Sequence, residues 1–125
     1  MTVRRSILAG LLAMLATPVA AQSVKLQPLE ITALLSGNTA VGTSAGANHR
    51  QYFDPDGTTI YAVDGSRSTL GEWRVQDDTY ESLWQNDAEW EGWFVMEFGG
   101  DFYWVSKTTP PTPFSVLDGN QLVKE

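Results

Sequence analysis

Residues 77–101 hold the side chains whose types and spacing are best suited to binding. This segment contains eight acidic residues and no Lys or Arg, and three Trp residues are interleaved with the acids. Carboxylates attract cations, and an indole face adds cation–π attraction. The candidate binding residues here are Trp84, Trp90, Trp93, Glu89 and Glu91. Two other interpretations stay open: a solvated acidic loop over a Trp-rich core, and stacking of a sugar on Trp90 or Trp93.

The sequence gives little support for catalysis. Glycoside hydrolysis needs two carboxyl groups about 5 to 9.5 Å apart, one of them with a raised pKa, and the spacing of Glu89 and Glu91 indicates neither. His49 is the sole His, so a Ser-His-Asp arrangement would have to be built on it. We therefore interpret His49 as an exposed strand residue and expect a protein that is not an enzyme.

No metal site or cofactor is expected either. Asp54-Pro55-Asp56-Gly57 begins like a calcium-binding loop, but the twelfth position from Asp54 is Gly65 rather than Glu. The same residues make a strong hairpin turn, because Pro presets φ and Gly accepts a positive φ. The chain has no Cys, which excludes disulfides and zinc–thiolate sites.

The elements that position these residues are short aromatic and β-branched runs separated by turn residues, a pattern typical of β-strands. The predicted strands are 39–43, 49–53, 58–63, 70–76, 80–85, 93–98, 102–107 and 114–117. A short helix is predicted over residues 29–36, because Ile31, Leu34 and Leu35 form one apolar stripe before Gly37. Residues 22–28 are expected to be a flexible start.

Tight turns between strands predict antiparallel neighbours. We expect a mainly β protein, a small up-and-down barrel of about eight strands with a short N-terminal helix, because closure removes the sheet edges that invite aggregation. The alternative is a two-sheet β-sandwich. Alternation places Trp73 in the interior and favours Phe94, Met96 and Phe98 as the inner face of their strand. The strand predicted over residues 102–107 has aromatic rings on both faces. The rings on its outer face need cover from another element, and the predicted helix is a candidate.

Residues 1–21 are typical of a secretory signal. Arg4 and Arg5 precede the apolar run 7–16, which is too short to span a membrane, and small residues at 19–21 fit a cleavage site. We expect export to a periplasm or the cell exterior, and one barrel domain over residues 22–125 without a membrane span. The net charge of -7 argues against a nucleic-acid partner.

Two motifs carry a family resemblance. Gln51 to Thr58 (QYFDPDGT) and Gly71 to Val75 (GEWRV) resemble a group of small exported alphaproteobacterial proteins of unknown function, some described as lipocalin-like, over roughly residues 37–105. The resemblance implies a β-barrel and export, and it implies no particular activity. Relatives often carry a Cys pair near positions 80–94, which this chain lacks. Lipocalins place Gly-x-Trp on the first strand after the helix, whereas here it falls on the fourth predicted strand.

The sequence thus predicts a non-enzymatic binding module. Its ligand is a small apolar or amphipathic molecule inside the barrel, near Trp73, because an eight-stranded barrel is either filled by side chains or holds one small ligand. The alternative is an acidic protein-interaction module or an inhibitor of a basic enzyme, with salt-dependent binding. The oligomeric state stays open.

Overall fold

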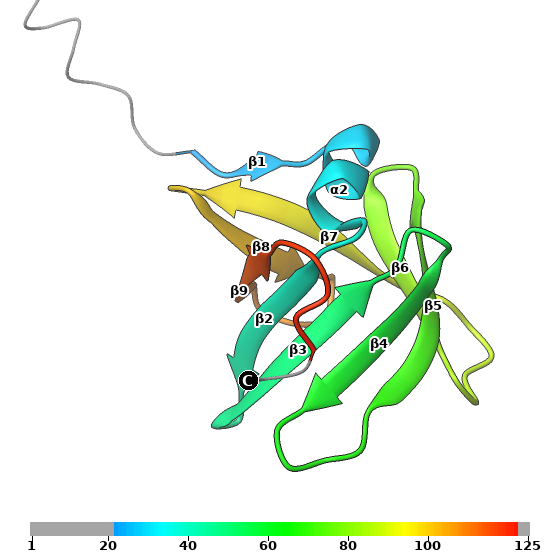
Figure 1. Ribbon diagram of the computed structural model, residues 1–125. Coiled ribbons are helices and arrows are strands. Elements are labelled where there is room, and N and C mark those ends of the chain that lie inside the picture. The colour runs from blue at the N-terminus through cyan, green and yellow to red at the C-terminus, as the bar shows by residue number, and fades with distance from the viewer. Residues whose placement is uncertain (1–21, 123–125) are drawn as a thin grey trace, which may run out of the picture.

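The computed structural model describes residues 22–122 (Figure 1). The predicted signal over residues 1–21 lies outside the described residues. A helix, α2 (Pro28–Leu35), follows a short strand β1 (Val24–Lys25). The remaining strands are β2 (Thr39–Ser44), β3 (Ala47–Phe53), β4 (Thr58–Val63), β5 (Thr69–Gln76), β6 (Thr79–Trp84), β7 (Glu91–Phe98), β8 (Asp101–Val105) and β9 (Thr112–Leu117).

Eight antiparallel strands close into a barrel, which confirms the predicted fold and excludes the sandwich. The pairing runs β7-β6-β5-β4-β3-β2-β9-β8, and β8 pairs with β7 to close the ring. From β2 to β9 every strand pairs with the next one along the chain, and β9 also pairs with β2, as in a regular up-and-down barrel. All eight predicted strands are present, with ends that differ by a few residues. The Gly-x-Trp motif lies on β5, the fourth strand after the helix.

The predicted flexible start is wrong at one point, because residues 24–25 form strand β1. Val24 and Lys25 pair with Glu97 and Met96 of β7, and Leu26 N donates to Val95 O at 2.8 Å. Strand β6 pairs only with the first residues of β7, 91–93. The rest of that edge would leave backbone groups unpaired, and β1 covers it.

Helix α2 closes one end of the barrel (Figure 1). Pro28 begins it, and Glu30 Oε1 accepts a hydrogen bond from Gln27 N at 2.8 Å, which completes a capping box. Ile31 and Leu35 are fully buried in the barrel core. The helix packs against β5 and β6, so it does not cover the outer face of 102–107. That expectation was wrong because a helix between β1 and β2 is held over the barrel end.

The inner face of β7 is the opposite of the predicted one. Val95 is fully buried, whereas Phe98 is exposed. The pairing explains this, because Trp93 lies opposite Tyr80 of β6, a residue of the core. Glu91 and Glu97 share the inward side with Trp93 and Val95, so charge on the interior face hides its apolar pattern.

The core fills the half of the barrel next to the helix. Phe53 is fully buried, with its ring 5.4 Å from that of Trp73 and 5.5 Å from that of Tyr80, both edge-on. Trp73 points inward as predicted, and its Nε1 donates to Asp54 O at 2.8 Å. We call this half the closed core; its buried apolar residues are Leu26, Ile31, Leu35, Ala40, Phe53, Trp73, Tyr80, Val95 and Phe114.

Candidate functional site

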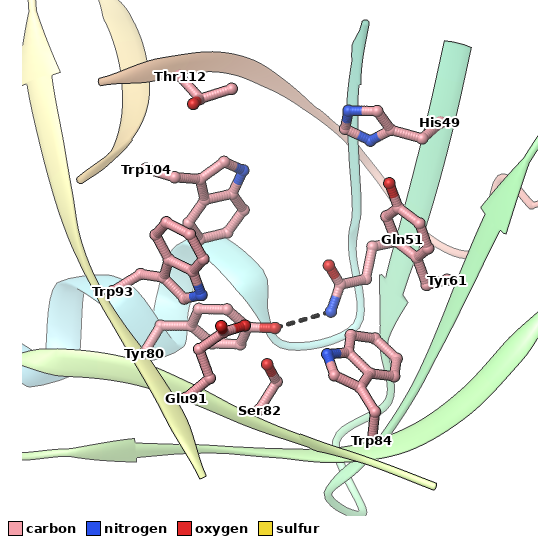
Figure 2. A pocket seen from close by; sticks show the side chains of 10 residues that line it. All are labelled: His49, Gln51, Tyr61, Tyr80, Ser82, Trp84, Glu91, Trp93, Trp104 and Thr112. Carbon is pink, nitrogen blue, oxygen red and sulfur yellow. Dashed lines mark hydrogen bonds between the residues drawn. The ribbon is translucent and has the colours of Figure 1, made fainter. Parts of the chain in front are cut away.

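The other half of the interior is an open pocket. Successive hairpins of an up-and-down barrel lie at alternate ends, so the β2–β3, β4–β5 and β6–β7 connections lie away from the helix (Figure 1). At that end the interior keeps a cavity of about 310 Å³ that is open to solvent. We call it the open pocket; it is lined by His49, Gln51, Tyr61, Tyr80, Ser82, Trp84, Glu91, Trp93, Trp104 and Thr112 (Figure 2).

One wall of the open pocket is a row of three rings. His49 stacks on Tyr61 with ring centroids 5.5 Å apart, and Tyr61 meets Trp84 edge-on at 5.9 Å. Two strand glycines make space for the row. A Cβ at Gly71 would lie 2.6 Å from Trp84 Cε3, and one at Gly42 would lie 2.9 Å from His49 Cε1. The rings at the two ends of this row, His49 and Trp84, therefore lie against the backbone of Gly42 and Gly71.

The opposite wall carries two more indoles and the carboxylate. Trp93 and Glu91 come from the start of β7, and Trp104 comes from β8. Trp104 stacks on Phe114 with a centroid distance of 3.9 Å and an interplanar angle of 12°. Trp104 thus joins the open pocket to the closed core, while Trp93 faces the cavity from beside it (Figure 2).

The floor of the open pocket is a partly buried polar network. Gln51 Nε2 donates to Tyr80 Oη at 2.7 Å and to Thr59 Oγ1 at 3.0 Å, and Thr59 Oγ1 donates to Tyr52 O at 2.8 Å. Burial raises the pKa of Tyr80 to about 12, against the opposing hydrogen bonds from Ser82 and Gln51. A smaller cause in the same direction is the negative charge of Glu91. The carboxylate is therefore close enough to the interior to act on it.

The structure brings together three of the six predicted site residues. Trp84, Trp93 and Glu91 all line the open pocket. Trp73 lies in the closed core and is not part of the pocket lining. Trp90 lies on the other side of the wall, where the Arg74 guanidinium carbon stands 3.9 Å from its ring centroid. Glu89 is exposed and outside the pocket.

Sequence reasoning missed several pocket residues. His49 was expected to be exposed, but it is half-buried and faces inward because it pairs with Gly42 across β2 and β3. Burial lowers its pKa, so the imidazole is neutral at pH 7. Tyr61 and Trp104 were also missed as site residues. Strand alternation anchored on the buried Phe53 was the available signal, since it places His49 and Gln51 on the same face.

The acidic segment is partly neutralised by cations from elsewhere in the chain. Arg74 Nε lies 2.7 Å from Glu81 Oε1, and Lys25 Nζ lies 2.6 Å from Asp78 Oδ2. Both pairs are partly exposed, and such pairs contribute little to stability. They do reduce the negative potential that a basic protein partner would meet on this side.

Asp54 and Asp56 are occupied by their own turn. Asp54 Oδ1 accepts from Asp56 N at 3.0 Å, and Asp56 Oδ1 accepts from Thr58 N and Oγ1 at 2.9 and 2.7 Å. The hairpin thus accounts for these residues. Over residues 22–122, no group of three or more His, Asp or Glu side chains is placed to hold a metal ion. In that same range the structure has no helix of the length and hydrophobicity needed to cross a membrane.

Comparison of this chain with models of known protein families, with curated proteins and with solved structures finds no match.

Proposed function

We propose that this chain is an exported, non-catalytic binding module that holds one small amphipathic molecule in the open pocket. The observation that carries the proposal is the unequal filling of the barrel. One half of the interior is packed, whereas the other keeps about 310 Å³ open to solvent. Small-molecule sites start near this size and are lined mainly by apolar and aromatic side chains with a few polar groups.

The lining fits an amphipathic ligand better than a purely apolar one. Tyr61, Trp84, Trp93 and Trp104 offer ring surface for the apolar part. Gln51 and Ser82 offer polar atoms inside the pocket, and the exposed Glu91 offers a carboxylate at its rim. A monomeric barrel that needed only to fold would gain stability by filling this space. Rings arranged around an unfilled mouth are therefore better explained by a ligand.

Native mass spectrometry of the gently purified protein tests the proposal, together with a titration using the neutral fluorescent probe N-phenyl-1-naphthylamine. We expect saturable probe binding that quenches Trp fluorescence, or a co-purified mass that disappears on denaturation. Trp84→Phe should weaken the quenching, and Trp90→Phe, which lies outside the open pocket, should leave it unchanged. A bare mass together with no saturable probe binding would overturn the proposal, and a salt-dependent pull-down with basic proteins would then test the acidic interaction module.

A further inference from the structure

We propose that the open pocket selects a small organic cation, a protonated amine or quaternary ammonium group carried on an apolar body. The inference rests on the proposed function, because it names the ligand class for the same cavity. Glu91 is the one carboxylate among the ten lining residues, and none of the ten is Lys or Arg. The lining has four further aromatic rings besides Tyr80 and His49, namely Tyr61, Trp84, Trp93 and Trp104.

The placement of the rings suits a cation. The faces of Trp and Tyr rings carry negative electrostatic potential, and several rings around one site form the cage that recognises quaternary ammonium groups. In Figure 2 the Trp93 and Trp104 rings stand across the cavity from Tyr61 and Trp84, with Glu91 beside Trp93. A cation between the walls would have aromatic rings on two sides and the Glu91 carboxylate at the rim.

The chain uses the same attraction on its outer surface, with its own cations. The Arg74 guanidinium carbon lies 3.9 Å from the Trp90 ring centroid, and Lys25 Nζ lies 5.0 Å from that of Phe94. Within residues 22–122, no comparable cation of the chain stands over the rings of the open pocket. Trp90 and Phe94 on the outer surface thus already have a cation of the chain beside them, whereas the rings of the open pocket do not.

Two acceptor groups of the open pocket, on Gln51 and Glu91, suit a cation. Both hydrogen bonds donated by Gln51 Nε2 go to the floor, to Tyr80 and Thr59, so its carbonyl oxygen is the atom left for a ligand (Figure 2). That oxygen and the Glu91 carboxylate accept hydrogen bonds but cannot donate them. The half-buried His49 is neutral at pH 7, so it does not repel a positive charge.

Lys107 is a cation of the chain that could compete for Glu91. It lines a neighbouring groove that also includes Glu91 and Trp93. No ion pair between Lys107 and Glu91 forms in the described part of the chain, where the two salt bridges are those of Lys25 and Arg74. The Glu91 carboxylate is therefore available to a ligand.

A matched charge series tests the inference. The probes are 2-phenylethylamine, 2-phenylethanol and phenylacetate, which share a ring and are similar in size but carry positive, zero and negative charge at pH 7. We expect the amine to bind about tenfold more tightly than the alcohol, or better, and phenylacetate to bind least. Calorimetry and Trp quenching with the full protein measure the three affinities, and higher salt should weaken the amine alone.

Two variants locate the charge preference. Glu91→Gln should remove most of the amine-over-alcohol ratio while leaving the affinity for 2-phenylethanol within about twofold. Glu89→Gln, which removes an exposed carboxylate two residues away, should leave the ratio unchanged. Equal affinities for amine and alcohol, with N-phenyl-1-naphthylamine still bound, would overturn the cation preference but keep the binding function. Failure of all four probes to bind would overturn both.

Discussion

The two halves of the barrel interior use the same kinds of residue but pack them differently. In the closed core, Phe53 is surrounded by rings and the helix, and it has no solvent-exposed surface. In the open pocket, Trp84 and Trp93 are half-buried around a cavity of about 310 Å³. The difference comes from the ends of the barrel, since α2 closes one end whereas hairpin connections border the other. Stability and binding are therefore expected to separate along the barrel axis.

The largest expected effect is on the closed core. Phe53→Ala should lower the free energy of unfolding by about 3 to 5 kcal/mol, because it removes a fully buried ring from a packed cluster. Trp93→Ala should cost about 1 kcal/mol, since its ring is half-buried beside a cavity. Urea unfolding measures both. The variants should have the opposite order in probe binding, with Trp93→Ala losing more; equal stability losses would contradict the division of the interior.

Alkaline pH should act on the closed core through Tyr80. Burial raises its pKa to about 12 in the folded protein, from an ordinary value near 10 in the unfolded chain. The unfolded state therefore loses its proton first, so the free energy of unfolding is intact below pH 10 and falls as the pH rises to 12. The fall attributable to Tyr80 is on the order of 2 to 3 kcal/mol.

A comparison of Phe variants at Tyr80 and Tyr61 isolates the contribution of Tyr80 to this alkaline decline. Chemical denaturation at a series of pH values should show a shallower alkaline decline in Tyr80→Phe than in the unchanged protein. Tyr61→Phe should alter the decline less, because Tyr61 is half-buried at the open pocket, although burial raises its pKa in the same direction. Identical declines in the three proteins would show that Tyr80 is not the group responsible.

A smaller effect is expected at Gly71, which supports the wall of the open pocket. Gly71→Ala places a Cβ 2.6 Å from Trp84 Cε3 and 2.8 Å from Leu83 O, so the ring must move. We expect a loss of about 1 to 3 kcal/mol in the free energy of unfolding and weaker probe binding. Gly92→Ala is the matched control, since its Cβ meets nothing closer than 3.6 Å. A tolerated Gly71→Ala with unchanged binding would mean that the Trp84 position does not matter.

The smallest effect is expected outside the barrel. Arg74→Ala removes the ion pair with Glu81 and uncovers the Trp90 ring. Exposed interactions of this kind are weak, so the free energy of unfolding should fall by less than about 1 kcal/mol. Affinity for 2-phenylethylamine should stay unchanged, because Arg74 is outside the pocket lining. A large change in that affinity would show that the outer acidic surface, rather than the open pocket, attracts the cation.

The eight barrel strands, the turns and the helix could be predicted from the sequence. Asp54-Pro55-Asp56-Gly57 specifies a hairpin through its own hydrogen bonds, and the stripe of Ile31 and Leu35 specifies which helix face is buried. These features are local, so residue type and spacing are sufficient to predict them. The short strand β1 was missed because it pairs with β7 only where β6 no longer does, and that point is set by the tertiary structure.

The rings that face the cavity could be identified only from the fold. Trp84, Trp90 and Trp93 look alike in the sequence, yet two line the open pocket and the third is covered by Arg74 outside. The inner face of β7 contains Glu91 and Glu97, so hydrophobic alternation favoured the wrong side. Register across the ladder fixed the true side, because Trp93 must lie opposite Tyr80 and Glu91 opposite Ser82. Such pairings join residues distant along the chain, and a period within one strand carries no information about them.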